Sequence, residues 1–139
     1  MNIINCDSNV LVVGPALPGH DFNEGQTDIR GRTCPWNTFA IWNMKYLPII
    51  GFPIISDGID NKDNGGVEEV ATVNMLQMLF SHLKAYLVKI SEFEWKVDFI
   101  DEERQKYHQQ KMNSKDERPN SQMEILQIPK GTVFHVAAN

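Results

Sequence analysis

The chain has 139 residues, which is enough for one domain with a single hydrophobic core. Its hydrophobic content of 42% and charged content of 22% are typical of a globular protein that folds in water. The net charge of −5 comes from 13 basic and 18 acidic side chains, and no cluster of Lys and Arg points to a nucleic-acid partner.

The sequence predicts a reduced, cytoplasmic location. The N-terminal stretch "MNIINCDSNV" lacks the basic start and apolar block of a signal peptide. The longest apolar run, "YLPIIGFPII", is too short to span a membrane and is interrupted by Pro48, Gly51 and Pro53. Cys6 and Cys34 form neither a disulfide framework nor a zinc-binding spacing.

The first half of the chain predicts a strand followed by a loop and a helix. "VLVVGP" reads as a buried strand over Val10–Val13, and the polar stretch "DFNEGQTDIRGRTCP" reads as a loop. "WNTFAIWNMKYL" predicts a short helix with Asn37 or Thr38 as its N-cap and Pro48 at its end. "IIGFPIIS" is apolar but contains Gly and Pro, so a strand or an extended buried connector is expected there.

The second half predicts a helix and a strand, then a charged helix and a last strand. "DGIDNKDNGG" is expected to be a loop, Val67–Leu83 a helix, and "KAYLVKI" a strand with Val88 and Ile90 on its inner face. "DEERQKYHQQKMNSKDERP" predicts a solvated helix that becomes a loop before Pro119, and "TVFHVA" predicts a strand. This alternation indicates a single α/β domain over residues 1–139, with a mixed sheet flanked by helices.

Two adjacent acids, Glu68 and Glu69, begin the helix expected at 67–83. On a helical wheel they lie away from a polar stripe that is expected to face water, and they share a face with apolar side chains; the stripe is Asn74, Gln77 and Ser81, and the apolar side chains are Met75, Leu76, Leu79 and Leu83. The helix dipole favours acids in the first turn but does not select the face, so a structural role and a cleft-facing site both stay open. A neighbouring carboxylate raises the pKa of one of the pair while the dipole lowers both pKa values. At least one carboxylate is therefore expected to be ionised at neutral pH, which suits a general base or a metal ligand.

The segments "TCPWNTFAIWNMKYLPIIGFPIISDG" and "GGVEEVATVNMLQML" together resemble the acceptor-side, C-terminal half of the GT-A fold of nucleotide-diphospho-sugar transferases. The resemblance extends from Val10 to Trp95. It implies a glycosyltransferase-like protein in which an acidic pair at a helix start, here Glu68 and Glu69, supplies the general base. It also implies that the ring of Trp36 or Trp42 lies against a sugar or packs the cleft.

The nucleotide-binding half of the family and its Asp-x-Asp motif are not seen in this chain. A lone acid, Asp7, stands where the motif is expected, and the basic-aromatic motif of processive members is also missing after the acidic pair. The chain therefore reads as a fragment, as a subunit that a partner completes, or as a domain that has lost the chemistry.

The resemblance also implies partners and a cofactor. The expected ligand is a nucleotide sugar or a glycan acceptor, contacted by Trp36, Asn37, Trp42, Asp57, Arg30 and Arg32. An inverting transfer needs positive charge on the leaving diphosphate, from Mn²⁺ or Mg²⁺ or from basic side chains. Asp7 and Asp57 are the candidate metal contacts, and Arg30 and Arg32 are candidates for binding phosphate. Lys111, Lys115 and Arg118 could also form a phosphate-binding stripe, although a solvated helix explains them as well.

Three alternatives accompany this interpretation. The chain could be a non-catalytic binding or assembly protein that meets a protein partner or a second copy of itself, which predicts an apolar patch or an open sheet edge. A thiol hydrolase would need Cys34 within hydrogen-bond reach of His20. A metal site on one loop would use His20, Asp21 and Glu24. The aromatic residues of 36–46 could form a sugar-stacking platform or simply part of the core.

Overall fold

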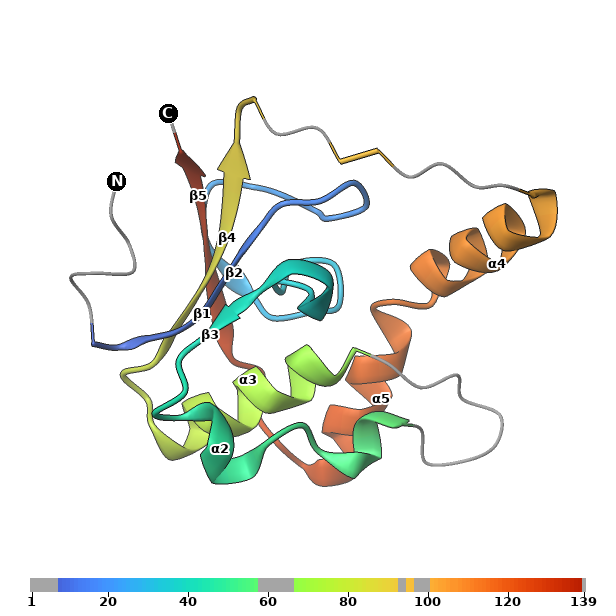
Figure 1. Cartoon of the computed structure of the whole chain (residues 1–139). Helices are drawn as coiled ribbons and strands as arrows, with labels where there is room; N and C mark the ends of the chain where they lie inside the picture. Colours follow the sequence, from blue (N-terminus) through green and yellow to red (C-terminus); the bar gives the residue numbers. More distant parts are fainter. Residues whose placement is uncertain (1–7, 58–66, 93–94, 97–100, 139) are drawn as a thin grey trace.

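The computed structural model describes residues 8–57, 67–92, 95–96 and 101–138, and these form an α/β domain around a five-stranded mixed sheet (Figure 1). The strands are β1 (Val10–Pro15), β2 (Gly25–Asp28), β3 (Ile41–Trp42), β4 (Lys84–Ile90) and β5 (Thr132–Ala138), in the order β2-β5-β4-β1-β3. The central strands β1, β4 and β5 are parallel, whereas β2 and β3 pair antiparallel at the two edges. The predicted α/β class and mixed sheet are confirmed.

The helices that connect the parallel strands lie on the same side of the sheet. α3 (Glu68–Leu79) precedes β4, and α4 (Glu102–Asn113) and α5 (Glu117–Leu126) precede β5. Both crossovers move in the same direction along the sheet, and right-handed crossovers of this kind put their helices on one face. In Figure 1, α3 and α5 pack beside each other with the short α2 (Leu47–Ile50), while α4 extends away from the sheet. None of the helices that the structure describes is long and apolar enough to cross a membrane.

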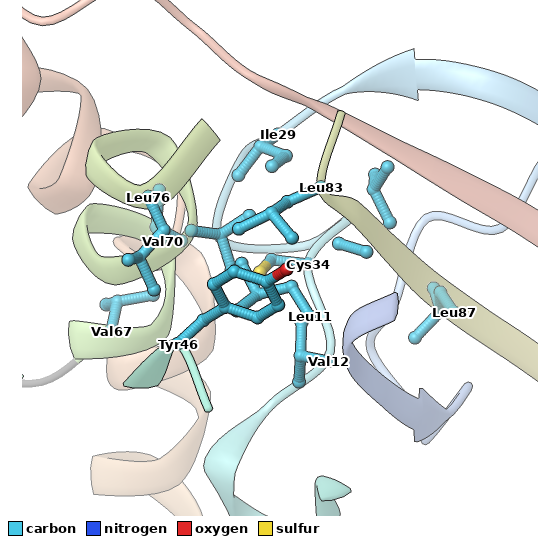
Figure 2. Close-up of a cluster of buried hydrophobic side chains, with 13 residues drawn as sticks. Leu11, Val12, Ile29, Cys34, Tyr46, Val67, Val70, Leu76, Leu83 and Leu87 are labelled. Atoms are coloured by element: carbon cyan, nitrogen blue, oxygen red, sulfur yellow. The ribbon is translucent and has the colours of Figure 1, made fainter. Parts of the chain in front are cut away.

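The hydrophobic core lies between the sheet and α3. Leu11, Val12 and Leu87 from the sheet belong to the same buried cluster as Val70 and Leu76 from the helix (Figure 2). In β4, Ala85 and Leu87 belong to the core cluster, and Val88 is buried as predicted, but Ile90 is 46% exposed, so its predicted inner position is wrong. The two faces of β4 are both apolar, and alternation alone cannot decide between them.

The helix predicted between Asn37 and Pro48 is wrong. The chain instead makes a 3₁₀ turn, η1 (Asn37–Phe39), and then strand β3, in which Trp42 pairs with Val12 of β1. Pro48 is in the first turn of α2 rather than after a helix, because a proline there gives up an N–H that has no helical partner. The stretch expected to be a strand contains the end of α2 and the 3₁₀ turn η2 (Ile54–Asp57).

The remaining elements match the predictions more closely, with changed boundaries. The helix expected to reach Leu83 ends at Leu79, and the last strand forms as expected. α4 is a solvated helix whose N-cap, Asp101, accepts a hydrogen bond from the backbone N–H of Arg104 at 2.7 Å. The chain turns at 114–116, before Pro119, as expected, but a second helix that was not predicted, α5, begins at Glu117 and has Pro119 in its first turn, where proline is tolerated. The polar loop expected at 57–66 lies outside the described residues, apart from the end of η2.

The polar stripe on α3 does not face water. Asn74 is buried and Gln77 is half-buried, because both carboxamides bind the backbone where β5 begins. Gln77 accepts a hydrogen bond from Thr132 N at 2.8 Å, and Asn74 accepts one from Gly131 N. A Cβ at position 131 would overlap the Gln77 side-chain oxygen, so a larger residue there would displace the carboxamide from the start of β5. A shallow pocket of about 200 Å³ adjoins these residues, at the C-terminal end of α3.

Candidate functional site

The candidate site is built on the N-terminus of α3. Since α3 ends shortly before β4 begins, its N-terminus points toward the edge at which the parallel strands end. Ligand sites of open α/β sheets are usually found at that edge. The residue before the helix, Val67, has φ 74°, and its side chain makes no capping hydrogen bond. A left-handed conformation is unfavourable for a β-branched residue, so the backbone entering the helix is strained, by about 1–3 kcal/mol.

Glu68 lies at the surface end of this turn and is half-buried. Its Oε1 accepts a hydrogen bond from Nδ2 of Asn37 at 3.1 Å. The Oδ1 of the same amide accepts a hydrogen bond from the indole Nε1 of Trp42 at 3.0 Å. The structure therefore brings together three residues that were predicted from sequence, in a chain of two hydrogen bonds.

An aromatic pair lies beside this chain of hydrogen bonds. The half-buried ring of Trp42 meets the ring of Phe52 edge to face, with centroids 5.5 Å apart and planes at 83°. Phe52 is 45% exposed, so part of an aromatic surface stays accessible beside Trp42, which the Asn37 amide links to Glu68. Phe52 was not predicted as a site residue, because its apolar segment reads as core or connector.

Glu69 has a different environment from that of its neighbour. It is 3% exposed, and burial raises its carboxyl pKa from 4.5 to about 7. A hydrogen bond from its own backbone N–H and the positive charge of Lys115 act in the opposite direction, and the negative charge of Glu68 adds to the rise. Glu69 is thus expected to be about half protonated near neutral pH.

Lys115 follows α4, and its ammonium group packs against the buried ring of Trp36. Its Nζ lies 3.7 Å from the centroid of the Trp36 ring, a cation–π geometry. Burial lowers the pKa of Lys115, while Glu69 raises it. Close packing holds the segment in place, because a Cβ at Gly31 would overlap the carbonyl of Lys115. No local pattern in the sequence indicates that Lys115 lies near Glu69, because only the tertiary fold brings the two together.

Trp36 is part of the core, whereas Trp42 is partly accessible. The ring of Trp36 is 6% exposed, stacks on His20 with centroids 3.7 Å apart, and donates a hydrogen bond from Nε1 to Gly31 O at 2.6 Å. Its ring therefore has little surface on which a sugar could stack. Of the aromatic set predicted as platform or core, Trp36 and Tyr46 are buried, and Phe39 is exposed.

The thiol-hydrolase hypothesis is wrong. His20 Nε2 lies 3.0 Å from the backbone oxygen of Cys34, and Nδ1 lies beside the backbone of Leu17. Both ring nitrogens thus face backbone groups instead of the thiol. Burial lowers the pKa of His20 to about 4, which makes it a weak base, and raises the pKa of the fully buried Cys34 thiol, which keeps the thiol protonated.

Arg30 and Arg32 are directed to the junction between α4 and α5. The guanidinium of Arg30 lies 3.9 Å from Asp21 and 3.8 Å from Asp116. The backbone N–H of Arg32 donates to Asp116 Oδ1 at 2.8 Å, and its Nε donates to Gly19 O at 3.1 Å. These contacts account for Arg32 structurally, whereas Arg30 is partly exposed and could still meet an anion.

The predicted metal contacts are not described. Asp7 and the side chain of Asp57 lie outside the described part of the chain. Within that part, no group of three or more His, Cys, Asp or Glu side chains is arranged to hold a metal ion, which includes the proposed set His20, Asp21 and Glu24. The described residues alone therefore do not form a metal site. Lys111, Lys115 and Arg118 lie on α4, the junction and α5, so they do not form one helical stripe.

No protein-family model, no curated protein and no solved structure matches this chain. The class of the protein rests on its own sheet topology, which is that of a single α/β domain with a mixed five-stranded sheet.

Proposed function

We propose that this protein is glycosyltransferase-like and binds a nucleotide-sugar donor or glycan acceptor at the N-terminus of α3, with Glu68 as the general base. The observation that carries the proposal is the geometry of Glu68: a half-buried carboxylate held by Asn37, next to the partly exposed aromatic pair of Trp42 and Phe52. Aromatic faces and edges suit the C–H surfaces of a sugar ring, and an oriented carboxylate suits proton abstraction from a hydroxyl.

Glu68 is the better candidate for the base than Glu69. A base must approach the hydroxyl within about 3 Å, which demands an accessible oxygen. Glu69 is 3% exposed, so an acceptor cannot reach it without a rearrangement of the core. Glu68 is half-buried, and one of its two oxygens, Oε1, accepts a hydrogen bond from Asn37.

The proposed reaction is an inverting transfer. The O–H bond of an acceptor hydroxyl breaks, and its proton goes to the carboxylate of Glu68. The oxygen then forms a bond to the anomeric carbon of the donor, and the bond from that carbon to the diphosphate breaks, so that the nucleoside diphosphate leaves with the electron pair. Mn²⁺ or Mg²⁺ stays a prediction from the resemblance, because its suggested ligands lie outside the described residues.

The test combines binding and turnover. Thermal shift with a panel of nucleotide sugars, with and without Mn²⁺, is expected to show stabilisation by at least one of them. With that ligand, E68Q should keep binding and lose turnover by about 10²–10⁴-fold. E103Q is the matched control, because Glu103 is also an acid in the first turn of a helix but is exposed on α4. No shift with any nucleotide sugar, or full turnover in E68Q, would overturn the proposal.

One observation on residues 39–56 favours a second candidate function. Residues 39–56 contain a single charged side chain, Lys45, and expose six large apolar ones: Phe39, Ile41, Met44, Ile49, Phe52 and Ile54. Ile54 is 86% exposed, which is a heavy cost for a side chain that meets only water. This surface supports a binding or assembly protein that meets a protein partner or a second copy. Under that function, native mass would rise with concentration or with partner, and I54S would abolish the rise.

A further inference from the structure

We propose that Trp42 is a positioning residue for Glu68: its indole N–H sets the orientation of the Asn37 amide, and this orientation makes Asn37 a donor to the carboxylate. The inference rests on the proposed function for its catalytic consequence, but its structural content concerns only these three residues. It gives Trp42 a role beyond contact with a sugar.

The argument begins with the chemistry of the indole group. An indole nitrogen donates a hydrogen bond and cannot accept one, so the atom that faces Nε1 of Trp42 must be an acceptor. The two ends of an Asn amide differ little in shape, and the hydrogen-bond partners decide which end points where. At 3.0 Å from the indole, the end of Asn37 that faces Trp42 must be its oxygen. The NH₂ group then has to face the other way.

The NH₂ end of Asn37 faces Glu68. Nδ2 lies 3.1 Å from Oε1, so the amide donates a hydrogen bond to the carboxylate. If the amide were reversed, its oxygen would face the carboxylate, and two acceptors would repel each other. The indole N–H therefore selects the arrangement in which Glu68 is held as a proton acceptor.

The position of the indole is set by the sheet. Trp42 is in β3, where it pairs with Val12 of the central strand β1, and its ring edge contacts Phe52. Asn37 is in the turn η1, which precedes the same strand. Pairing of β3 with β1 thus fixes the donor, and the amide transmits that position to the first turn of α3. This arrangement explains how the Glu68 carboxylate, which follows a residue with a positive φ, is held in one orientation.

The test uses the indole N–H resonance of Trp42 in ¹H–¹⁵N spectra of the full chain during an acid titration. In the wild type this resonance is expected to move as Glu68 is protonated, because the amide between them is polarised by the carboxylate. The movement should vanish in E68Q and in N37A, and persist in E69Q. Assignment follows from the loss of one indole signal in W42F. Movement that persists in N37A or E68Q would overturn the proposal.

Turnover supplies the second readout. W42F keeps an aromatic ring but loses the donor, and N37D keeps an acceptor for the indole but can no longer donate to Glu68 when it is ionised. Both are expected to lose about tenfold in kcat, the factor that corresponds to one hydrogen bond to a charged group, with KM changed less. Unchanged kcat in both variants would overturn the positioning role. Coupled resonances without any turnover in the wild type would support the orientation of Glu68 and overturn the transferase function instead.

Discussion

Replacing the buried carboxyl of Glu69 by an amide should stabilise the protein at alkaline pH and leave it almost unchanged at acid pH. In the folded chain the pKa of Glu69 is about 7, against 4.5 for an unperturbed carboxyl. The folded state therefore holds its proton more tightly than the unfolded state, and stability falls as pH rises from about 4.5 through 7. Below 4.5 both states are protonated and the penalty is absent.

The magnitude follows from the two pKa values. The interval from 4.5 to about 7, at about 1.4 kcal/mol per pH unit, gives a penalty of about 3 kcal/mol once the pH is well above 7. Glu69 is 3% exposed, so solvent screening reduces this figure little. A glutamine has the shape of the protonated acid, so E69Q should exceed the wild type by less than about 1 kcal/mol near pH 5. It should exceed the wild type by up to about 3 kcal/mol near pH 8.5.

The difference in stability between E69Q and the wild type also cancels an opposing contribution from His20. Burial lowers the pKa of His20 to about 4, so the folded state binds this proton less tightly than the unfolded state. That contribution is fully present above about 6.5 and is lost as pH falls toward 4, which is opposite in sign to that of Glu69. The pH dependence of the wild-type stability alone contains the contributions of both Glu69 and His20. The difference between E69Q and the wild type isolates Glu69.

Urea denaturation followed by tryptophan fluorescence at pH 5, 6, 7 and 8.5 measures this difference, with equal m-values as the check that only stability changes. E24Q is the control, because Glu24 is exposed and its removal should give no such pH-dependent gain. A difference for E69Q that is the same at pH 5 and 8.5 would refute the reasoning. Lower stability of E69Q at pH 8.5 would show that the charged carboxyl and Lys115 stabilise each other by more than burial costs.

Three further predictions concern the packing around this site and the start of β5. K115M removes the positive charge that lowers the pKa of Glu69, so the stability difference between K115M and K115M/E69Q should level off at a higher pH, and at a larger value, than the difference between the wild type and E69Q. G31A should lower stability in urea denaturation by about 1–3 kcal/mol, because a Cβ there would overlap the carbonyl of Lys115. Q77A removes the side chain that binds Thr132 N at 2.8 Å and Thr132 O at 2.8 Å. It should cost about 1–3 kcal/mol and speed hydrogen exchange at the Thr132 amide, and unchanged exchange would contradict that role.

The strands that could be predicted from the sequence are those with an apolar pattern of their own. The strands that form only because they pair with a neighbouring strand could not be predicted. β1, β4 and β5 are apolar runs of ordinary strand length, and each was predicted. β2, over Gly25–Asp28, is mostly exposed and carries no apolar pattern, so only its pairing with β5 makes it a strand. The segment of β3 was predicted as a helix for a related reason: its aromatic residues have helical spacing, but they also fit a strand that pairs with β1.

The polar residues of α3 show what a helical wheel omits. A wheel assigns Asn74 and Gln77 to solvent because they are polar, yet the backbone of β5 supplies buried partners for both. Those partners are distant in sequence, so no local pattern reveals them. The same limit applies to the site: Asn37, Trp42 and Glu68 could be named from sequence, but their hydrogen bonds could not, and Lys115 was not connected with Glu69 at all.

The two adjacent glutamates obtain different environments from helix geometry alone. Successive residues of an α-helix point about 100° apart, so a side chain at 69 that enters the core directs the side chain at 68 toward the rim, where Asn37 lies. Burial of Glu69 thus fixes the rotation of α3 that Glu68 needs, but an uncharged side chain at 69 would fix it as well, without the pH-dependent penalty. E69Q separates these roles. If E69Q is stabilised at pH 8.5 and still binds the nucleotide sugar, Glu68 alone carries the ligand function; if it is stabilised and binding is lost, the ionised carboxyl of Glu69 takes part in it.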